Sequence, residues 1–502
     1  MDAYGHTDKN LRSHSVGTVH SELWILAAFF VLFLIVNLLT ASRYPIVWID
    51  EVEFVDPAEN LFLDHGFTSK AWPHRNDDKF FASYPPLYPF MLSAWINVSG
   101  FSPTGVRSLN YLLVILAAAS IWLAVKRLKL VEFPWSRLLL VVLVLLGYGV
   151  SMSYRSGRPD MLTFLLAASA FLAYTHRSIT IRCALLTTLG VLCPFAGLQL
   201  LAFAMIFASL LLFYLKKKFV KEFICIVLGL GVGVISLIVV YHINGVLNNF
   251  VASVRPQTTV GLLEMIFEGN FSPRNRVPAD LSLITLMLTV FLILSCRLRD
   301  RTFKWNSMLS FGLVVSFIVP TGMLLAGKFP TYYSWMVYVP LVVCVSSSLA
   351  LIKKPSKVRS VVIGLLMLAC LAGLPLQLAI SAYDWEDRDH GPVEHMVEAN
   401  LAAYDWVYCD YAAYYAVKKR VKKVFLPNSL NWLSPHQKEK ISALVIAPQK
   451  LEGVTKNIGG RWNPVGEGVE LKKGSLFEDI LGLRTDLGLF GKKYHLRIYR
   501  RE

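Results

Sequence analysis

Acidic side chains gather in one short stretch of this sequence, VWIDEVEFVDPAENLFLDHGF, which runs from Val47 to Phe67. The stretch contains six carboxylates and begins its acidic part with the adjacent pair Asp50 and Glu51. A positioned carboxylate can act as a general base, because it takes the proton that a nucleophile loses as it attacks. Successive residues of a helix point about 100° apart, so one acid of the pair could face a cavity while the other holds a neighbouring group. A solvated loop face is the competing interpretation of the same residues.

A second charged group, Arg155, Arg158 and Asp160, lies in the short segment YRSGRPDM between two apolar runs. Charges this close to the hydrocarbon of a membrane are costly unless they are paired or functional. A purely structural ion pair between Arg158 and Asp160 explains these residues as well as a binding role does. The sequence leaves both interpretations open.

Long apolar runs make up most of the chain that must position these residues. Of the 502 residues, 55% are hydrophobic and 17% are charged, and the mean hydropathy is +0.50, which is unusual for a soluble globular protein. A membrane-spanning helix needs about 20 mostly apolar residues, so the sequence predicts a polytopic α-helical membrane protein with about eleven transmembrane helices. The candidate spans are 22–41, 106–125, 137–153, 160–175, 181–195, 197–215, 222–243, 281–296, 308–327, 332–352 and 358–380.

Basic residues predict which side of the membrane each loop faces, because Lys and Arg collect in cytoplasmic loops. They recur in every second loop, at 126–129, 176–182, 216–221, 297–301 and 353–359. The first apolar run is too long for the core of a signal peptide and lacks a small-x-small cleavage site, so we interpret it as a retained span. The N-terminus is then cytoplasmic, and the acidic segment and the C-terminus are extracytoplasmic. Contact of the basic loops with membrane lipids explains the net charge of +16 without a nucleic-acid partner.

Two domains are predicted from this organisation: a transmembrane domain over residues 1–380, whose outer loop 43–105 carries the acidic pair, and a soluble extracytoplasmic α/β domain over residues 381–502. Within the outer loop, the spacing of the apolar residues after Glu51 predicts an amphipathic helix lying on the bilayer. Pro85 and Pro86 predict a sharp corner before the next apolar helix.

The C-terminal domain is expected to contain strands in AYDWVYCD, VKKVFLP, ISALVIAP and KYHLRIYRRE, with a helix in YAAYYAVKKR. Nothing in it resembles a catalytic motif. The DRD pattern at 387–389 fits a metal site only weakly, because so short a match in a polar linker is most often solvated charge.

Five segments occur in the order seen in a known family: WIDEVEFVDPAENLFLDHG, YPPLYPFMLSAW, GVRSLNYLLV, RSGRPDMLTFLLAASAF and GKFPTYYSWMVYVPL. Over about residues 20–350 the chain resembles the polyprenyl-phosphate-sugar-dependent glycosyltransferases of the GT-C fold, which include protein O-mannosyltransferases and the aminoarabinose transferases of lipid A. The resemblance implies transfer of a sugar from a lipid-linked phosphate to an acceptor lipid, protein or glycan, with inversion at the anomeric carbon.

The resemblance also implies roles for individual residues. Asp50 matches the acid of the family and is the expected base, since inversion by a single displacement needs one carboxylate near the nucleophile. Glu51 is expected to serve the acceptor side or to hold the loop, and Asp160 is the third acid of the predicted catalytic group. No metal ligand is assigned, and a divalent metal stays open as a cofactor.

The leaving phosphate needs cations or oriented donors to stabilise its developing charge. Arg107, Arg158 and Lys328 are the expected cations, all near outer span ends, and Tyr332 or Tyr333 could add a hydroxyl donor. For Arg107 and Lys328, anchoring at the membrane interface is an equal alternative.

The chain departs from the family pattern at one position of this phosphate site. Many relatives carry a Lys just before the Pro-Pro pair, where this chain has Tyr84. Lys79 or His74 of the same loop is a candidate substitute, although a solvated loop residue is the more frequent state of each.

Two other classes of membrane protein are considered. A secondary transporter would carry ionisable groups near the bilayer midplane and broken spans in repeated halves, and the sequence has few such charges and no repeat. A polysaccharide polymerase or ligase also uses lipid-linked sugars and outer-loop arginines. It would be expected to have a large late outer loop without the early acid pair, so it is the closer alternative.

Overall fold

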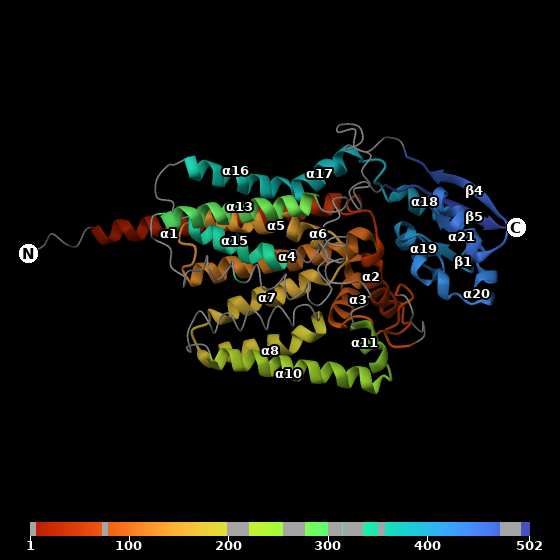
Figure 1. The fold of residues 1–502 in the computed structure, drawn as a ribbon, viewed down its shortest axis with the longest axis horizontal. Coiled ribbons are helices and arrows are strands. Elements are labelled where there is room, and N and C mark those ends of the chain that lie inside the picture. The colour runs from red at the N-terminus through yellow and green to blue at the C-terminus, as the bar shows by residue number, and fades with distance from the viewer. Residues whose placement is uncertain are drawn as a thin grey trace, which may run out of the picture.

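The computed structural model describes residues 7–72, 79–197, 220–254, 277–299, 314, 335–349, 357–471 and 493–502. Within these ranges the chain forms a bundle of long helices with a small mixed sheet at its C-terminal end (Figure 1). The predicted fold class, a helical membrane protein with a C-terminal α/β domain, is confirmed.

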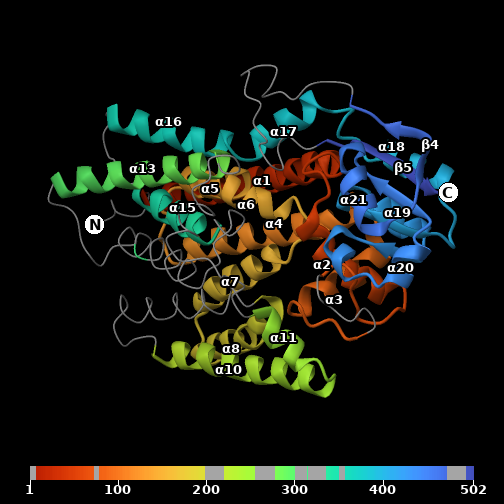
Figure 2. The same cartoon turned by 45° about the vertical axis from the view of Figure 1, so that its right-hand side comes forward.

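The helices of the bundle run roughly side by side along the long axis of the molecule (Figures 1 and 2). Among the described residues, four helices are long and apolar enough to cross a membrane, or up to six if each of two bent pairs is one span. Three shorter apolar helices accompany them in the same ranges. The bundle comprises α1 (Thr7–Thr40), α4 (Pro103–Arg127), α5 (Pro134–Leu146), α6 (Tyr148–Tyr154), α7 (Asp160–Tyr174), α8 (Ile179–Ala196), α10 (Val220–Ile243), α13 (Val277–Arg299), α15 (Trp335–Leu349), α16 (Lys357–Leu371) and α17 (Leu374–Tyr383).

Two of the predicted spans, 137–153 and 358–380, are each two helices and not one. The axes of α5 and α6 differ by 53° across Gly147, and those of α16 and α17 differ by 46° near Gly373. The two breaks touch each other: a Cβ atom added to Gly373 would lie 1.9 Å from the carbonyl oxygen of Leu146. Glycine at this crossing lets the two backbones approach closely.

The bundle has one basic end, far from the C-terminal domain. α4 has 25 residues and is therefore about 37 Å long, which exceeds the hydrocarbon thickness of a bilayer. At its far end, Arg127 donates a hydrogen bond of 3.4 Å to the Thr175 hydroxyl. The basic loops 126–129 and 176–182 thus lie together at that end. The predicted spans 197–215 and 308–327 fall almost entirely outside the described residues.

Three shorter helices, α2 (Ile49–Phe62), α3 (Leu87–Ser99) and α11 (Leu247–Val254), lie at the end of the bundle next to the C-terminal domain (Figure 1). The helix predicted after Glu51 is α2, and Pro86 directly precedes α3, as expected for a corner. α2 is enclosed by protein, however, and does not lie on a lipid surface with one face free. Asp56 and Glu59 on its polar side are as buried as its apolar residues.

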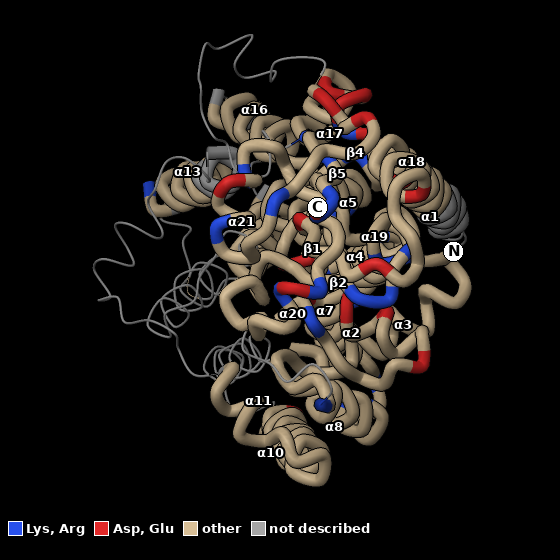
Figure 3. The backbone as a smooth tube through the Cα atoms, turned by 90° about the vertical axis from the view of Figure 1, so that its right-hand side faces the viewer, with Lys and Arg blue, Asp and Glu red and all other residues tan. Residues whose placement is uncertain are grey.

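The C-terminal domain is a five-stranded sheet with short helices. The strand order is β2-β1-β3-β5-β4; β1 runs parallel to β2 and β3, whereas β5 is antiparallel to β3 and β4. Seen from this end, acidic and basic residues are interspersed over the domain (Figure 3). The strands are β1 (Trp406–Cys409), β2 (Lys423–Phe425), β3 (Ala443–Ile446), β4 (Trp462–Val469) and β5 (Leu496–Arg501). The helices are α18 (Gly391–Asn400), α19 (Tyr414–Arg420), α20 (Pro435–Lys440) and α21 (Leu451–Ile458), with 3-10 turns η4 (Tyr411–Ala413), η5 (Pro427–Trp432) and η6 (Pro448–Lys450).

The predicted strands β1, β2, β3 and β5 and the predicted helix α19 are all present. Strand β4 was not predicted, because its sequence WNPVGEGV contains proline and two glycines, which disfavour strands. It forms at an edge of the sheet, the position where proline is tolerated since no further strand needs its missing N–H group.

Candidate active site

The first turn of α2 carries both acids of the pair, and their side chains have different partners. Asp50 accepts a hydrogen bond from Arg158, in the loop before α7. Glu51 accepts hydrogen bonds from Arg107 of α4. The helical turn between two successive residues explains this divergence.

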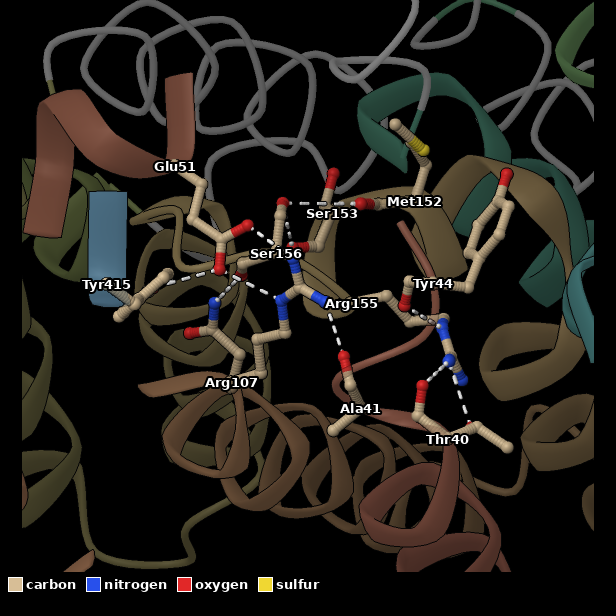
Figure 4. A network of polar contacts seen from close by, with 11 residues as sticks. Thr40, Ala41, Tyr44, Glu51, Arg107, Met152, Ser153, Arg155, Ser156 and Tyr415 are labelled. Atoms are coloured by element: carbon tan, nitrogen blue, oxygen red, sulfur yellow. Dashed lines mark hydrogen bonds and ion pairs between the residues drawn. The ribbon is translucent and has the colours of Figure 1, made fainter. Parts of the chain in front are cut away.

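Glu51 and Arg107 form a bidentate ion pair inside the protein (Figure 4). Arg107 Nε donates to Glu51 Oε1 at 2.8 Å and Nη2 donates to Oε2 at 2.5 Å, and both side chains are 0% exposed. Arg107 Nη1 donates to the carbonyl oxygen of Ala41, and the Tyr415 hydroxyl donates to Glu51 Oε1 at 3.1 Å. The pair therefore ties α2 to α4, to the end of α1 and to the C-terminal domain.

Arg158 bridges two carboxylates. Its Nε donates to Asp160 Oδ2 at 2.8 Å, and its Nη1 donates to Asp50 Oδ2. The side chains of Arg158 and Asp160 are 3% and 0% exposed, whereas that of Asp50 is 20% exposed. The ion pair between Arg158 and Asp160 considered from the sequence is present, and Asp50 is the acid of this cluster that a molecule in solution can reach.

Polar residues of the spans hold the loop that carries Arg158. The Asn110 side chain donates to the carbonyl oxygens of Ser156, at 2.5 Å, and Arg158, at 2.9 Å. A Cβ atom on Gly157 would lie 2.7 Å from a methyl group of Val106 and 2.9 Å from one of Val55. This close approach of loop, α4 and α2 requires glycine.

Arg155 joins the same loop to the end of α1 (Figure 4). Its guanidinium donates to Asn37 Oδ1 at 2.9 Å, to the Tyr44 carbonyl at 3.1 Å and to both oxygens of Thr40. Sequence reasoning singled out Arg155 but not Asn37 or Asn110. Their signal was available, because an amide within an apolar span needs a polar partner.

Several residues proposed from the sequence lie outside the described part of the chain: Lys328, Tyr332, Tyr333 and His74. Lys79 is described and exposed. Tyr84, which stands where a phosphate-binding Lys was expected from the family resemblance, packs its ring edge-on against Phe54, with 4.8 Å between the ring centroids. The centroid of the Phe54 ring lies 5.4 Å from the guanidinium carbon of Arg158. Tyr84 therefore supports the Arg158 side chain indirectly, through its contact with Phe54.

The C-terminal domain binds further acids of α2, and the sequence did not predict this contact. Asp56 accepts hydrogen bonds from the Tyr414 hydroxyl, at 2.7 Å, and from Lys418, at 3.2 Å. Ser69 and the Lys70 amide also donate to it. Burial alone would raise the pKa of Asp56, but Lys418 and these hydrogen bonds outweigh it and lower that pKa from its usual value.

Glu53, one turn after Asp50, was likewise missed. Asn428 of η5 donates to Glu53 Oε1 at 2.8 Å, and the side chain is only partly buried. Burial, followed by the nearby charge of Asp50, raises the pKa of Glu53 to about 8, although Arg158 and Asn428 act in the opposite direction. Burial and the neighbouring Asp50 thus favour the neutral form of Glu53.

The described residues contain no cluster of three or more His, Cys, Asp or Glu side chains arranged to hold a metal ion. In the DRD segment, Asp387 pairs with Lys493 at 3.0 Å and Asp389 with Arg43 at 3.2 Å. These aspartates thus bind basic side chains of the protein.

No protein-family model and no curated protein matches the sequence of this chain. Its structure is similar to the crystal structure of ArnT from Cupriavidus metallidurans in the apo state, with a TM-score of 0.59, 10% sequence identity and coverage of 94% of this chain and 98% of ArnT. The chain has the ArnT fold. ArnT from the same organism bound to undecaprenyl phosphate gives a TM-score of 0.57 and 11% identity, with coverage of 94% and 97%. The similarity confirms the fold predicted from the ordered motifs.

Proposed function

We propose that this protein is an inverting glycosyltransferase that moves a sugar from a polyprenyl-phosphate donor to an acceptor lipid, protein or glycan. The observation that carries the proposal is the partly exposed Asp50 next to the Arg158 guanidinium, at one end of a membrane bundle. The ArnT fold supports it, because one structure of ArnT holds undecaprenyl phosphate.

The reaction is a single displacement in which Asp50 is the general base. An acceptor hydroxyl gives its proton to Asp50, and its oxygen forms a bond to the anomeric carbon. The bond from that carbon to the phosphate oxygen breaks on the opposite face, and the polyprenyl phosphate leaves with the electron pair. One displacement inverts the configuration, whereas a retaining reaction needs a carboxylate nucleophile.

Arg158 has two tasks in this mechanism. Its bond to Asp50 favours the ionised carboxylate that a base requires, and its positive charge can stabilise the leaving phosphate. Asp160 holds the guanidinium from the other side and is a positioning residue. Arg107 is a weaker candidate for the phosphate, because its described contacts engage it with Glu51 and Ala41. We retain Lys328, Tyr332 and Tyr333 as further candidate ligands of the phosphate on the basis of the sequence.

We place the site and the C-terminal domain, residues 381–502, on the extracytoplasmic side of the membrane domain, residues 1–380. The basic loops 126–129 and 176–182 support this orientation, since they lie at the other end of the bundle and basic loops are typically cytoplasmic. Cysteines introduced at Lys129 and at exposed Asn431 test it in intact cells. A membrane-impermeant maleimide should label only Asn431→Cys. Labelling of Lys129→Cys alone would mean that the protein has the opposite orientation.

Transfer by the purified full-length chain tests the function directly. The protein in lipid nanodiscs is supplied with a panel of polyprenyl-phosphate sugars and with extracted membranes as the acceptor source, and products are identified by intact mass. We expect one sugar to be added per event and free polyprenyl phosphate to be released, with Asp50→Asn as the inactive comparison. Addition of a preassembled oligosaccharide chain would instead indicate a polymerase or ligase.

A further inference from the structure

The C-terminal domain contacts α2 through side chains that differ in what they leave free. Tyr415 donates to the buried carboxylate of Glu51, and Tyr414 and Lys418 donate to the buried carboxylate of Asp56. Asn428 meets Glu53, which is only partly buried. Among the described residues, this is the contact in which the C-terminal domain reaches a partly exposed acid of α2 beside Asp50.

Glu53 is held in place beside Asp50. Residues three apart on a helix lie on the same face, about 5–6 Å apart at Cβ, so Asp50 and Glu53 are neighbours. The Trp72 indole N–H donates to the Glu53 carbonyl oxygen at 2.7 Å, and Asn428 fixes one carboxyl oxygen. Among the described residues, no hydrogen bond to the other carboxyl oxygen is seen, and the Glu53 side chain is partly exposed.

The charges around Glu53 come from three elements. Asp50 of α2 disfavours its ionised form, and Arg158 of the loop before α7 favours it. Tyr411 of η4 also faces Glu53: burial, followed by the charge of Glu53, raises the pKa of this tyrosine. A neutral carboxyl carries one O–H donor and one acceptor oxygen. With Asn428 donating to the acceptor oxygen, the O–H group can donate to a hydroxyl oxygen of a ligand.

Building on the proposed glycosyl transfer, we propose that Glu53 and Asn428 form an acceptor subsite that binds a second hydroxyl group of the acceptor while Asp50 deprotonates the attacking one. Asp50 then binds one hydroxyl group of the acceptor and Glu53 binds another. This arrangement selects an acceptor that carries several hydroxyl groups. The acceptor is therefore a saccharide or the sugar headgroup of a glycolipid, and not a protein side chain with a single hydroxyl.

The subsite is tested with acceptors of defined structure, using the donor that supports transfer by the wild-type chain. Methyl hexosides, their monodeoxy analogues and serine- or threonine-containing peptides are compared as acceptors. The wild type should use a hexoside and should lose about 5- to 100-fold in kcat/KM when the bound hydroxyl is deleted. Glu53→Ala and Asn428→Ala should raise the hexoside KM and should no longer distinguish the deoxy analogue.

The pH profile separates binding by Glu53 from a structural role. Because the pKa of Glu53 is about 8, its O–H donor is present below that pH and is lost above it. Wild-type kcat/KM should therefore decline above pH 8. In Glu53→Gln, the amide oxygen accepts from Asn428 and the amide N–H group is a donor at all pH values. This variant should therefore bind the hexoside better than Glu53→Ala does, and its kcat/KM should not decline above pH 8.

Two exposed residues of the C-terminal domain provide matched controls. Asn431 is exposed on the same 3-10 turn as Asn428, and Glu398 is exposed on α18, so Asn431→Ala and Glu398→Gln should leave kinetics unchanged. Discrimination against the deoxy analogue that persists in Glu53→Ala overturns the subsite while leaving the transferase function intact. Wild-type use of peptides alone overturns it as well. Failure of the wild type to transfer any sugar removes both proposals.

Discussion

Asp50 and Glu51 are adjacent on one helix, yet the structure places them in opposite settings. Glu51 is 0% exposed and bound bidentately by Arg107, whereas Asp50 is 20% exposed and shares Arg158 with Asp160. A carboxylate whose oxygens are occupied by protein donors holds the fold together. One that is partly exposed beside a shared cation can meet a substrate. The comparison supports the proposed roles of Asp50 as the general base and of Glu51 as an acid that holds the surrounding elements together.

The largest expected effect comes from Asp50→Asn. Asparagine keeps the size of the side chain and can still accept from Arg158, but it cannot take a proton. Transfer should fall by about 10²–10⁴-fold, the usual contribution of a positioned base, with donor binding and thermal stability retained. The measurement is single-turnover transfer at saturating donor, with Glu51→Gln measured alongside. Near-normal turnover in a well-folded Asp50→Asn protein would falsify the mechanism.

Arg107→Ala should affect stability before chemistry. It leaves the Glu51 carboxylate buried without its cation, which costs about 3–5 kcal/mol. Thermal unfolding in detergent should show a large loss, and a second substitution, Glu51→Leu, should restore part of it because the uncompensated charge is removed. If Arg107→Ala is instead stable but fails to bind undecaprenyl phosphate, Arg107 belongs to the phosphate site after all.

Arg158→Ala should reduce transfer about ten- to a hundredfold, the value of one charge-assisted contact of about 1.5–3 kcal/mol. Arg158→Lys is the matched variant, because an ammonium keeps the charge but cannot bind two carboxylates through separate guanidinium nitrogens. Compared with Arg158→Ala, the Arg158→Lys variant should regain more of the wild-type affinity for the phosphate than of the wild-type kcat. Equal transfer by wild type and both variants would leave the cluster without a role in the reaction.

Tyr415→Phe should give the smallest effect. The change removes one hydrogen bond to Glu51, 3.1 Å long, and should cost about 1 kcal/mol of stability without altering kcat. The same substitution at Tyr411, near Glu53, serves as the comparison by thermal unfolding and kinetics. A specific loss of kcat in Tyr415→Phe would mean that the Glu51 pair also responds to the substrate.

Much of the local structure followed from short-range patterns. The acids of α2, the corner at Pro86 and the strands β1, β2, β3 and β5 lie where the sequence predicted them. The glycine breaks at Gly147 and Gly373 were not predicted, because a glycine within an apolar run does not say whether another backbone will cross it. The edge strand β4 was missed because its composition disfavours strands and only its pairing with β5 makes it one.

The sequence by itself determined that this is a helical membrane protein, that Asp50 and Glu51 stand together at the start of a helix, and that Arg158 and Asp160 lie close to each other. Only the tertiary structure decided which acid is exposed, which arginine is fully engaged and that the C-terminal domain closes over α2. The physical reason is distance along the chain. Tyr415 reaches Glu51 across 364 residues, and Asn428 reaches Glu53 across 375, and no local pattern of apolar and polar residues encodes such a contact.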